Sequence, residues 1–387
     1  MKRSFFVFTT GFALFSMFFG AGNLVFPLKL GAEAQENFLI AVSGFSLSAV
    51  IVPLLAFFSM MLFHGDYRAF FANVGKKSGL ILVTMILLLL GPFGGIPRCI
   101  ALSYSAAHQV FPDISLGWFS FISSFVIFLL TVRENRIVDI LGNILSPLLL
   151  LTLGLILVCG VFSSNELASN AESLVHSFAK GIIEGLQTLD LLAALLFSCF
   201  LYPLLSDRVH TKSAKRLDWL SLQVSLIAGL LLFVVYLGFC YLAATHATVL
   251  QDSPKELFLI SLSEHLLGSS GAQVTMLLVL LAILTTVIAL SAIFSEFLKK
   301  ELFCNKVNYE TCLGITMGLS FLFSLLDFNG IVMVLAPILV MFYPALIVLC
   351  IANIAHKKCG FEYVRLSFFV TLGATVTYQL LEMTKIV

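Results

Sequence analysis

Four residues that break or weaken helices lie close together in the first apolar segment of the chain, in the stretch FFGAGNLVFP at residues 18–27. Gly20 and Gly22 would point to nearly opposite faces of a helix, whereas small residues that pack helices together are usually four apart. Asn23 competes for backbone hydrogen bonds, and Pro27 cannot donate one to the Asn23 carbonyl. Within a membrane, the freed carbonyls would attract a cation and the following half-helix N-terminus a carboxylate. The stretch predicts half of a binding site, with a simple kink as the alternative.

A second polar interruption lies in AKGIIEGLQTLDLLAALLFSCFLYP, at residues 179–203. It contains Gly181, Gly185, Thr188 and Asp190. A carboxylate within a membrane is costly and is usually functional, so Asp190 is a candidate for binding a ligand, with Thr188 as a hydrogen-bond donor beside it. The alternatives are that Asp190 lies near the outer interface or caps a half-helix.

Three hydroxyl groups, those of Thr285, Thr286 and Ser291, lie in ILTTVIALSAIFSEFLKK at residues 283–300. Their oxygens could complete a cage for a small hard cation, or they could bond back to their own helix. One basic residue, Arg98, falls within an apolar span, in GPFGGIPR at residues 91–98. Either its side chain reaches the outer surface, or it pairs with an acidic residue as part of a gate.

The composition defines the environment in which these residues act. Hydrophobic residues make up 60% of the chain and charged residues 11%, whereas soluble domains are about one quarter charged, so the chain is predicted to be an all-α integral membrane protein in contact with the lipid bilayer. A net charge of +1 without a basic patch argues against nucleic acid as a partner, and nothing indicates an obligate protein partner. The eight cysteines lack metal-binding spacing, and motifs of hydrolases or ATP-driven pumps are absent from the sequence, so we expect neither an enzyme nor a cofactor.

A helix needs about 20 apolar residues to cross a bilayer, and eleven segments of the chain qualify. The third contains GPFGGIPR and is too long for a straight crossing, so we expect it to be bent, tilted or partly interfacial. The segments are 5–30, 38–63, 79–110, 116–132, 139–163, 178–205, 219–244, 271–298, 309–326, 329–354 and 363–383.

The charges of the loops test this count, because cytoplasmic loops carry the excess of Lys and Arg. With the N-terminus inside, 17 of the 22 Lys and Arg residues fall in inner segments, four in outer segments, and Arg98 within a span. The protein is therefore expected to be multi-pass, with a cytoplasmic N-terminus and, after an odd number of spans, an outer C-terminus.

Ten of the spans divide into five plus five, and because five is odd the second set crosses in the opposite direction. Inverted-repeat transporters have this arrangement, with the ligand near the midplane on a discontinuous helix that opens each repeat. We accordingly expect the first and sixth spans to be interrupted. The predicted units are residues 1–163, residues 178–354 and an additional helix within residues 355–387.

Five motifs, in order along the chain, resemble those of the bacterial branched-chain amino acid carriers, the system II or LIVCS family. The resemblance implies a LeuT-like fold and cation-coupled uptake of leucine, isoleucine and valine across the bacterial cytoplasmic membrane. The motifs are GFALFSMFFGAGNLVFPLKLG (11–31), GPFGGIPR (91–98), TLDLLAALLF (188–197), LTTVIALSAIFSEF (284–297) and APILVMFYPALIV (336–348).

The same resemblance implies roles for individual residues. Substrate contacts fall on Phe19, Gly20, Ala21, Gly22 and Asn23. A Na⁺ site is implied at the carbonyls of Ser16 and Phe19 with Ser291, and Thr286 as a further candidate. Two features depart from the family: Ala292 follows Ser291 where relatives have consecutive hydroxyls, and members generally have twelve spans.

Two other functions remain open at the level of the sequence. One is a proton-coupled carrier of another small neutral amino acid or solute, which a dependence on Na⁺ would distinguish. The other is a channel or a non-transporting membrane protein. Uptake of leucine accelerated by internal leucine would exclude a channel.

Overall fold

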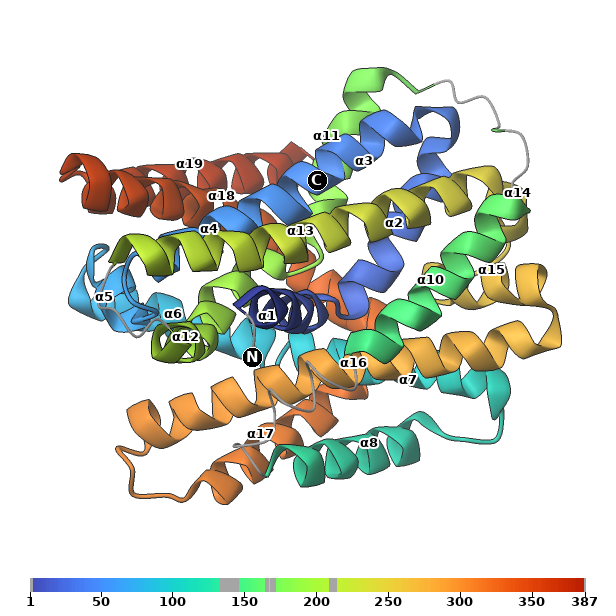
Figure 1. The fold of residues 1–387 in the computed structure, drawn as a ribbon, viewed down its shortest axis with the longest axis horizontal. Coiled ribbons are helices and arrows are strands. Elements are labelled where there is room, and N and C mark those ends of the chain that lie inside the picture. The colour runs from blue at the N-terminus through green and yellow to red at the C-terminus, as the bar shows by residue number, and fades with distance from the viewer. Residues whose placement is uncertain (1–2, 133–145, 164–166, 168–171, 209–213, 386–387) are drawn as a thin grey trace.

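The computed structural model describes residues 3–132, 146–163, 167, 172–208 and 214–385, and within these ranges the chain forms helices without any strand (Figure 1). Helices suit an apolar chain in a bilayer because they satisfy every backbone polar group internally. The elements are α1 (Arg3–Phe18), α2 (Ala21–Ala34), η1 (Gln35–Asn37), α3 (Phe38–Ser46), η2 (Leu47–Ile51), α4 (Val52–Met61), α5 (Tyr67–Ala72), α6 (Lys76–Leu90), α7 (Gly95–Val110), α8 (Leu116–Thr131), α10 (Ser146–Phe162), α11 (Leu174–Leu186), α12 (Asp190–Arg208), α13 (Ala214–Thr245), α14 (Ala247–Leu250), η5 (Lys255–Leu257), α15 (Phe258–Leu267), α16 (Ser269–Phe297), η6 (Leu298–Leu302), α17 (Tyr309–Ser324), α18 (Asp327–Cys359) and α19 (Val364–Lys385).

The helices confirm the predicted all-α membrane architecture. Among the described residues, seven helical stretches are long and apolar enough to cross a membrane, and three shorter apolar helices accompany them. Each of the eleven predicted segments corresponds to a helix or a broken pair of helices, although residues 139–145 of the fifth lie outside the described part of the chain. The first span is divided into α1 and α2, and the sixth into α11 and α12, as the inverted repeat requires.

The long third span is divided as well, because α6 ends at Leu90 and α7 begins at Gly95 within GPFGGIPR. A Cβ atom on Gly94 would lie 2.1 Å from the Leu89 carbonyl oxygen, so the bend between the two helices needs a residue without a side chain. The bend turns Arg98, in the first turn of α7, toward the interior of the bundle, where the residue is only 3% exposed.

Gly181 and Gly185, which the sequence suggested as helix breakers, lie within the continuous helix α11. Cβ atoms there would lie 2.1 Å from the Ala41 carbonyl oxygen and 2.1 Å from Ser48 Oγ. The two glycines are four residues apart and therefore share one face, which lets α11 approach α3 and η2 closely. The sequence interpretation of these two residues was wrong, because they pack helices together and the break comes after them.

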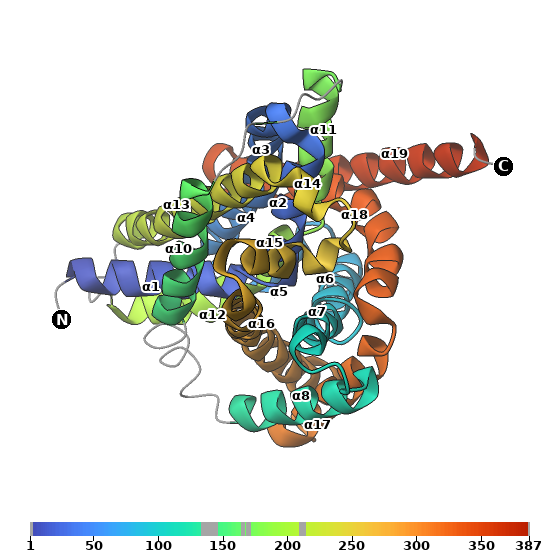
Figure 2. The same cartoon turned by 90° about the vertical axis from the view of Figure 1, so that its right-hand side faces the viewer.

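The two ends of the bundle differ in the elements that they carry. Figure 1 shows α5 at one end, with α12 and the start of α13, and α14 and α15 at the opposite end, near the end of α2. Seen from that second end, α8 lies beside α17 and α18 beside α19 at the periphery, around the central helices (Figure 2). The half-helix α1 runs across the long axis of the bundle, because Figure 2 shows it in side view with the N-terminus at one flank, whereas in Figure 1 it points along the viewing direction.

Candidate binding site at two broken helices

The first break lies at Phe19 and Gly20, between α1 and α2. Gly20 has an extended backbone, with φ −113° and ψ −159°, and its N–H donates to Asn23 Oδ1 at 3.1 Å. Asn23 thus caps the new helix from its third position, as in half of a capping box. The sequence placed the freed carbonyls near Asn23, but α2 continues through Pro27, whose own carbonyl accepts a hydrogen bond from Cys240 Sγ at 3.1 Å. Because Pro27 has no N–H, the Asn23 carbonyl still receives no hydrogen bond from its own helix. A further carbonyl is freed one turn earlier, at the end of α1, because the Gly20 N–H donates to the Asn23 side chain.

The second break lies between Leu186, the last residue of α11, and Asp190, the first of α12. Leu189 has a φ of +70°, a left-handed conformation that costs a residue with a side chain about 1–3 kcal/mol. The carbonyls at the end of α11, which have no N–H partner in their own helix, accept hydrogen bonds from α7. Arg98 Nη1 donates to the Gln187 carbonyl at 2.7 Å and Nη2 to that of Thr188 at 3.3 Å. A cation at a helix C-terminus is also favoured by the helix dipole. The structure therefore places Arg98 inside the protein and not at its outer surface.

A buried polar cluster joins the two breaks. Asn23 Nδ2 donates to Asp190 Oδ2 at 2.7 Å and also to the hydroxyl of Tyr236, which in turn donates to Asp190 Oδ2 at 3.2 Å. The three residues are at most 2% exposed. The predicted residues Asn23 and Asp190, 167 positions apart, are thus in direct contact. Tyr236 was not predicted, although it is a lone hydroxyl-bearing residue within the apolar stretch LLLFVVYLGF of α13.

Gly20 and Gly22 face different helices, as their spacing predicts. A Cβ atom on Gly20 would lie 3.2 Å from Thr286 Oγ1 of α16. One on Gly22 would lie 2.8 Å from the Cα of Thr188 and 2.9 Å from Arg98 Nη2. The first glycine therefore faces the threonines and the second faces the other break. Ala21, between them, lines the central cavity.

The three predicted hydroxyls of α16 fall into two groups. Thr285 Oγ1 donates to the Ser16 carbonyl at 2.9 Å, and Thr286 Oγ1 to that of Met17 at 3.2 Å, so both threonines lie against the end of α1. Ser291 does not join them, because its hydroxyl donates to Met317 Sδ of α17 at 3.5 Å. The structure thus brings Ser16 and Thr286 together and adds Met17 and Thr285, but it does not bring Ser291 to the same carbonyls.

Phe19, at the first break, is fully buried, with its ring stacked on Phe15 at 5.3 Å and packed on Phe239 at 6.4 Å between centroids. A central cavity lies beside this break, lined by residues of both breaks and by α7 and α16, among them Gly20, Asn23, Arg98, Thr188, Asp190 and Thr286. Its volume of about 20 Å³ is roughly the space of one water molecule, so the centre of the protein is tightly closed.

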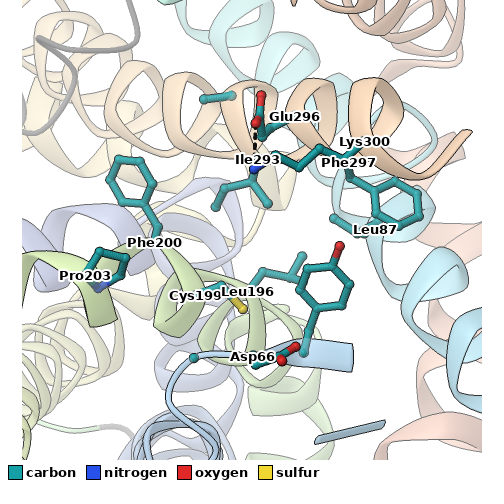
Figure 3. A pocket seen from close by; sticks show the side chains of 13 residues that line it. Asp66, Leu87, Leu196, Cys199, Phe200, Pro203, Ile293, Glu296, Phe297 and Lys300 are labelled. Carbon is teal, nitrogen blue, oxygen red and sulfur yellow. Dashed lines mark ion pairs between the residues drawn. The ribbon is translucent and has the colours of Figure 1, made fainter. Parts of the chain in front are cut away.

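A larger cavity of about 540 Å³ lies between α5, α12 and α16, on the α5 side of the breaks. Figure 3 shows its lining: Leu196 and Phe200 of α12 face Ile293 of α16, and Asp66 lies beside the start of α5. Lys300, which pairs with Glu296 at 2.8 Å, has a side chain that is 56% exposed, so the cavity reaches the protein surface there. The apolar walls and charged rim give a chamber that is open toward one end of the bundle.

Ion pairs join the two half-helices α2 and α11. Lys29 pairs with Glu184, whose side chain is only 11% exposed, and Lys180 pairs with Glu33 at 3.0 Å. Paired charges with limited access to water are screened less than fully exposed ones. These contacts tie α2 to α11, and none of the four residues lines the 540 Å³ cavity.

Two discontinuous helices facing each other across a buried polar cluster, in an all-helical membrane bundle, define a membrane transporter with a LeuT-like fold. The model of the family described as "Branched-chain amino acid transport protein" matches residues 3–387, and the chain belongs to that family. It is 31% identical over 348 residues to the branched-chain amino acid permease BrnQ of Corynebacterium glutamicum, a match that covers 89% of this chain and 79% of that protein. The chain is accordingly a carrier and not an enzyme.

Solved structures show the same fold at much lower identity. Mhp1, a nucleobase-cation-symport-1 family transporter in a closed conformation with bromovinylhydantoin bound, has a TM-score of 0.66 and 14% identity, covering 98% of this chain and 92% of that chain. The manganese transporter of Eremococcus coleocola has a TM-score of 0.65 and 15% identity, covering 100% of this chain and 88% of that chain. At these identities the similarity concerns the fold alone.

Proposed function

We propose that the protein imports leucine, isoleucine and valine across the bacterial cytoplasmic membrane by alternating access, coupled to the entry of Na⁺. The observation that carries this proposal is the contact between the two breaks, where Asn23 and Asp190 meet at a central cavity. The positive Arg98, the negative Asp190 and the ends of the half-helices meet at this cavity. The binding of a zwitterion requires such groups for both of its charges. The relationship to a branched-chain amino acid permease supports the choice of substrate.

The chemistry of the residues around the central cavity suits an aliphatic amino acid, although the cavity must widen from the volume of about one water molecule to admit it. Asp190 and the carbonyls near it offer acceptors for an ammonium group, and the hydroxyl of Thr188 lies beside them, donating to the Gly185 carbonyl at 2.9 Å. Much of the remaining lining is apolar, including Phe18, Leu90 and Leu290. An apolar wall accommodates a branched side chain without leaving polar groups unpaired.

We assign the coupling ion to the oxygens between α1 and α16. The carbonyls of Ser16 and Met17 and the hydroxyls of Thr285 and Thr286 lie within hydrogen-bond distance of one another, and Thr285 Oγ1 also lies 2.7 Å from the Ala282 carbonyl oxygen. Carbonyls of unwound helices coordinate Na⁺ in transporters of this kind. A proton is the alternative ion, favoured by the buried carboxylate of Asp190.

The arrangement of cavities corresponds to an inward-facing conformation. The loop-charge pattern predicts that the end with α5 is cytoplasmic, and the 540 Å³ cavity opens toward that end. We assign the ion pairs of Lys29 and Lys180, which the same charge pattern places in outer segments, to the closure of the other end. Import would then require the two ends to open in turn around the breaks.

The available energy is sufficient for accumulation. One Na⁺ moving down a potential of about 100 mV gains roughly 2.3 kcal/mol. A tenfold concentration gradient adds about 1.4 kcal/mol, so one ion could support accumulation on the order of 500-fold. No further source of energy is needed.

The test is uptake of labelled leucine, isoleucine and valine into proteoliposomes that contain the purified protein. We expect uptake to require an inward Na⁺ gradient and to be accelerated by leucine inside the vesicles. Uptake driven by a pH gradient in Na⁺-free buffer would show that the coupling ion is the proton and not Na⁺. Absence of exchange with internal leucine would contradict a carrier for branched-chain amino acids.

A further inference from the structure

Arg98 is a buried cation that shares the central cavity with Asp190 but makes no direct ion pair with a carboxylate among the described residues. It is 3% exposed and lines the central cavity. Two of its N–H groups donate to the Gln187 and Thr188 carbonyls, but Nε is buried and has no hydrogen-bond partner. Arg98 forms no ion pair with a carboxylate of the described residues, and the oxygen of Asp190 that faces the cluster already accepts from Asn23 and Tyr236. A buried charge is costly unless an opposite charge or hydrogen bonds compensate it.

A second positive feature meets Arg98 at the same point of the cavity. Gly22 lies in the first turn of α2, where free backbone N–H groups and the helix dipole favour an anion. Arg98 Nη2 lies 2.9 Å from the position that a Cβ atom of Gly22 would occupy. The guanidinium and the half-helix N-terminus thus converge from two different spans on one place.

We propose that Arg98 binds the α-carboxylate of the transported amino acid, together with the N-terminus of α2. The ammonium group then lies toward Asp190, so the two charges of the zwitterion are read by residues of two different helices, α7 and α12. Guanidinium and carboxylate form a charge-assisted pair with matching geometry. This assignment rests on the proposed function, because it concerns how the same central site recognises its substrate.

The competing explanation is that Arg98 only satisfies the carbonyls at the end of α11. Both roles predict that a variant such as Arg98→Gln loses affinity for leucine. They differ for a ligand without a carboxylate. If Arg98 binds the carboxylate, leucine amide has no charge pairing to lose when the guanidinium is removed, and at most a weaker neutral hydrogen bond, whereas a distorted α11 would weaken both ligands equally.

The experiment measures the binding of leucine and of leucine amide to purified full-length protein in lipid nanodiscs. We use Arg98→Gln, Arg98→Lys and, as a matched control, Arg365→Gln, whose guanidinium lies over the Phe369 ring on α19. For wild type we expect leucine to bind more tightly than leucine amide. In Arg98→Gln we expect the Kd of leucine to rise about 10- to 100-fold, as for a lost charge-assisted hydrogen bond, with the Kd of leucine amide changed less than about threefold.

Arg98→Lys keeps the charge and should give an intermediate Kd for leucine, which provides a test if Arg98→Gln does not fold. Equal weakening of both ligands in either variant would overturn the proposal, as would a wild type that binds leucine amide as tightly as leucine. Either of these two outcomes would contradict the role of Arg98 only, and the proposed import would still stand if wild-type proteoliposomes accumulate leucine. Failure of the wild type to bind or accumulate leucine would instead overturn the proposed function itself.

Discussion

At the scale of single residues, the chemistry of the site follows from which side chains are absent as much as from which are present. Gly20 and Gly22 leave room on two faces of the first break, one for the threonines of α16 and one for the second break. The sequence predicted both faces, because spacing along a helix determines direction. It could not predict Tyr236, because contacts between distant spans depend on packing and not on local pattern.

Gly22→Ala should abolish leucine uptake while leaving the amount of protein in the membrane unchanged. The added Cβ would lie 2.8 Å from the Cα of Thr188, a backbone atom that cannot move aside without shifting the second break. Gly154→Ala in α10 is the matched control, because no atom lies within 4 Å of a Cβ there. Near-normal uptake by the Gly22 variant would contradict the assignment of the break to the binding site.

Thr286→Val should raise the Na⁺ concentration for half-maximal uptake by about tenfold, because it removes a ligand oxygen and keeps the shape of the side chain. Ser291→Ala is the control, since the hydroxyl of Ser291 contacts Met317 and not α1. The measurement is leucine uptake into proteoliposomes over a series of Na⁺ concentrations. A larger shift in the half-maximal Na⁺ concentration for the Ser291 variant would instead support Ser291 as the Na⁺ ligand, as the family resemblance implies.

At the scale of elements, the spans were predictable and the positions of the breaks were less so. Apolar length determines where a helix can cross, so the eleven predicted segments agree with the helices to within a few residues over the described ranges. The function of individual glycines is harder to predict, because the same residue weakens a helix and lets two helices approach. Gly181 and Gly185 pack α11 against α3, whereas Gly20 stands at a break.

The ion pair between Lys29 and Glu184 should stabilise the contact of α2 with α11. Its side chains are 25% and 11% exposed, so Glu184→Gln should lower stability by about 1–3 kcal/mol, between the values for exposed and buried pairs. The measurement is the thermal midpoint in detergent together with leucine uptake. The double variant Lys29→Met with Glu184→Gln should lose little more stability than Glu184→Gln alone, and fully additive losses would show that the pairing itself is not what matters.

At the scale of the whole molecule, a large cavity opens toward one end, and the ion pairs that we assign to the closure of the other end give the protein a direction. The 540 Å³ cavity and the exposed Cys304, just after η6, lie toward the end that we assign to the cytoplasm. Neither the cavity nor the conformation could be predicted from the sequence, because both depend on how the helices tilt against one another.

In a Cys359→Ser background, which removes the other exposed thiol of the described residues, a membrane-impermeant maleimide should therefore label Cys304 in inside-out vesicles and not in right-side-out vesicles. In a Cys304→Ser, Cys359→Ser background, the same reagent should reach Cys199 through the inner cavity, whose wall contains it. Leucine and Na⁺ applied to the outer face should slow labelling of Cys199 by favouring closure of that cavity. Labelling of Cys304 from the outer face alone would reverse the proposed orientation.

The threonine hydroxyls at the end of α1 also bear on the return half of a transport cycle. A carrier has to reset after releasing its cargo, and bare carbonyls within a membrane would make that step expensive. Here Thr285 and Thr286 donate to the carbonyls of Ser16 and Met17 themselves. A cation needs the lone pairs of the same hydroxyls, so their hydrogens must rotate away when it arrives, at about 0.5–1.5 kcal/mol for each bond given up. The carbonyls at the end of α1 then exchange threonine hydroxyls for a cation, so the break in the helix has polar partners in both halves of the cycle.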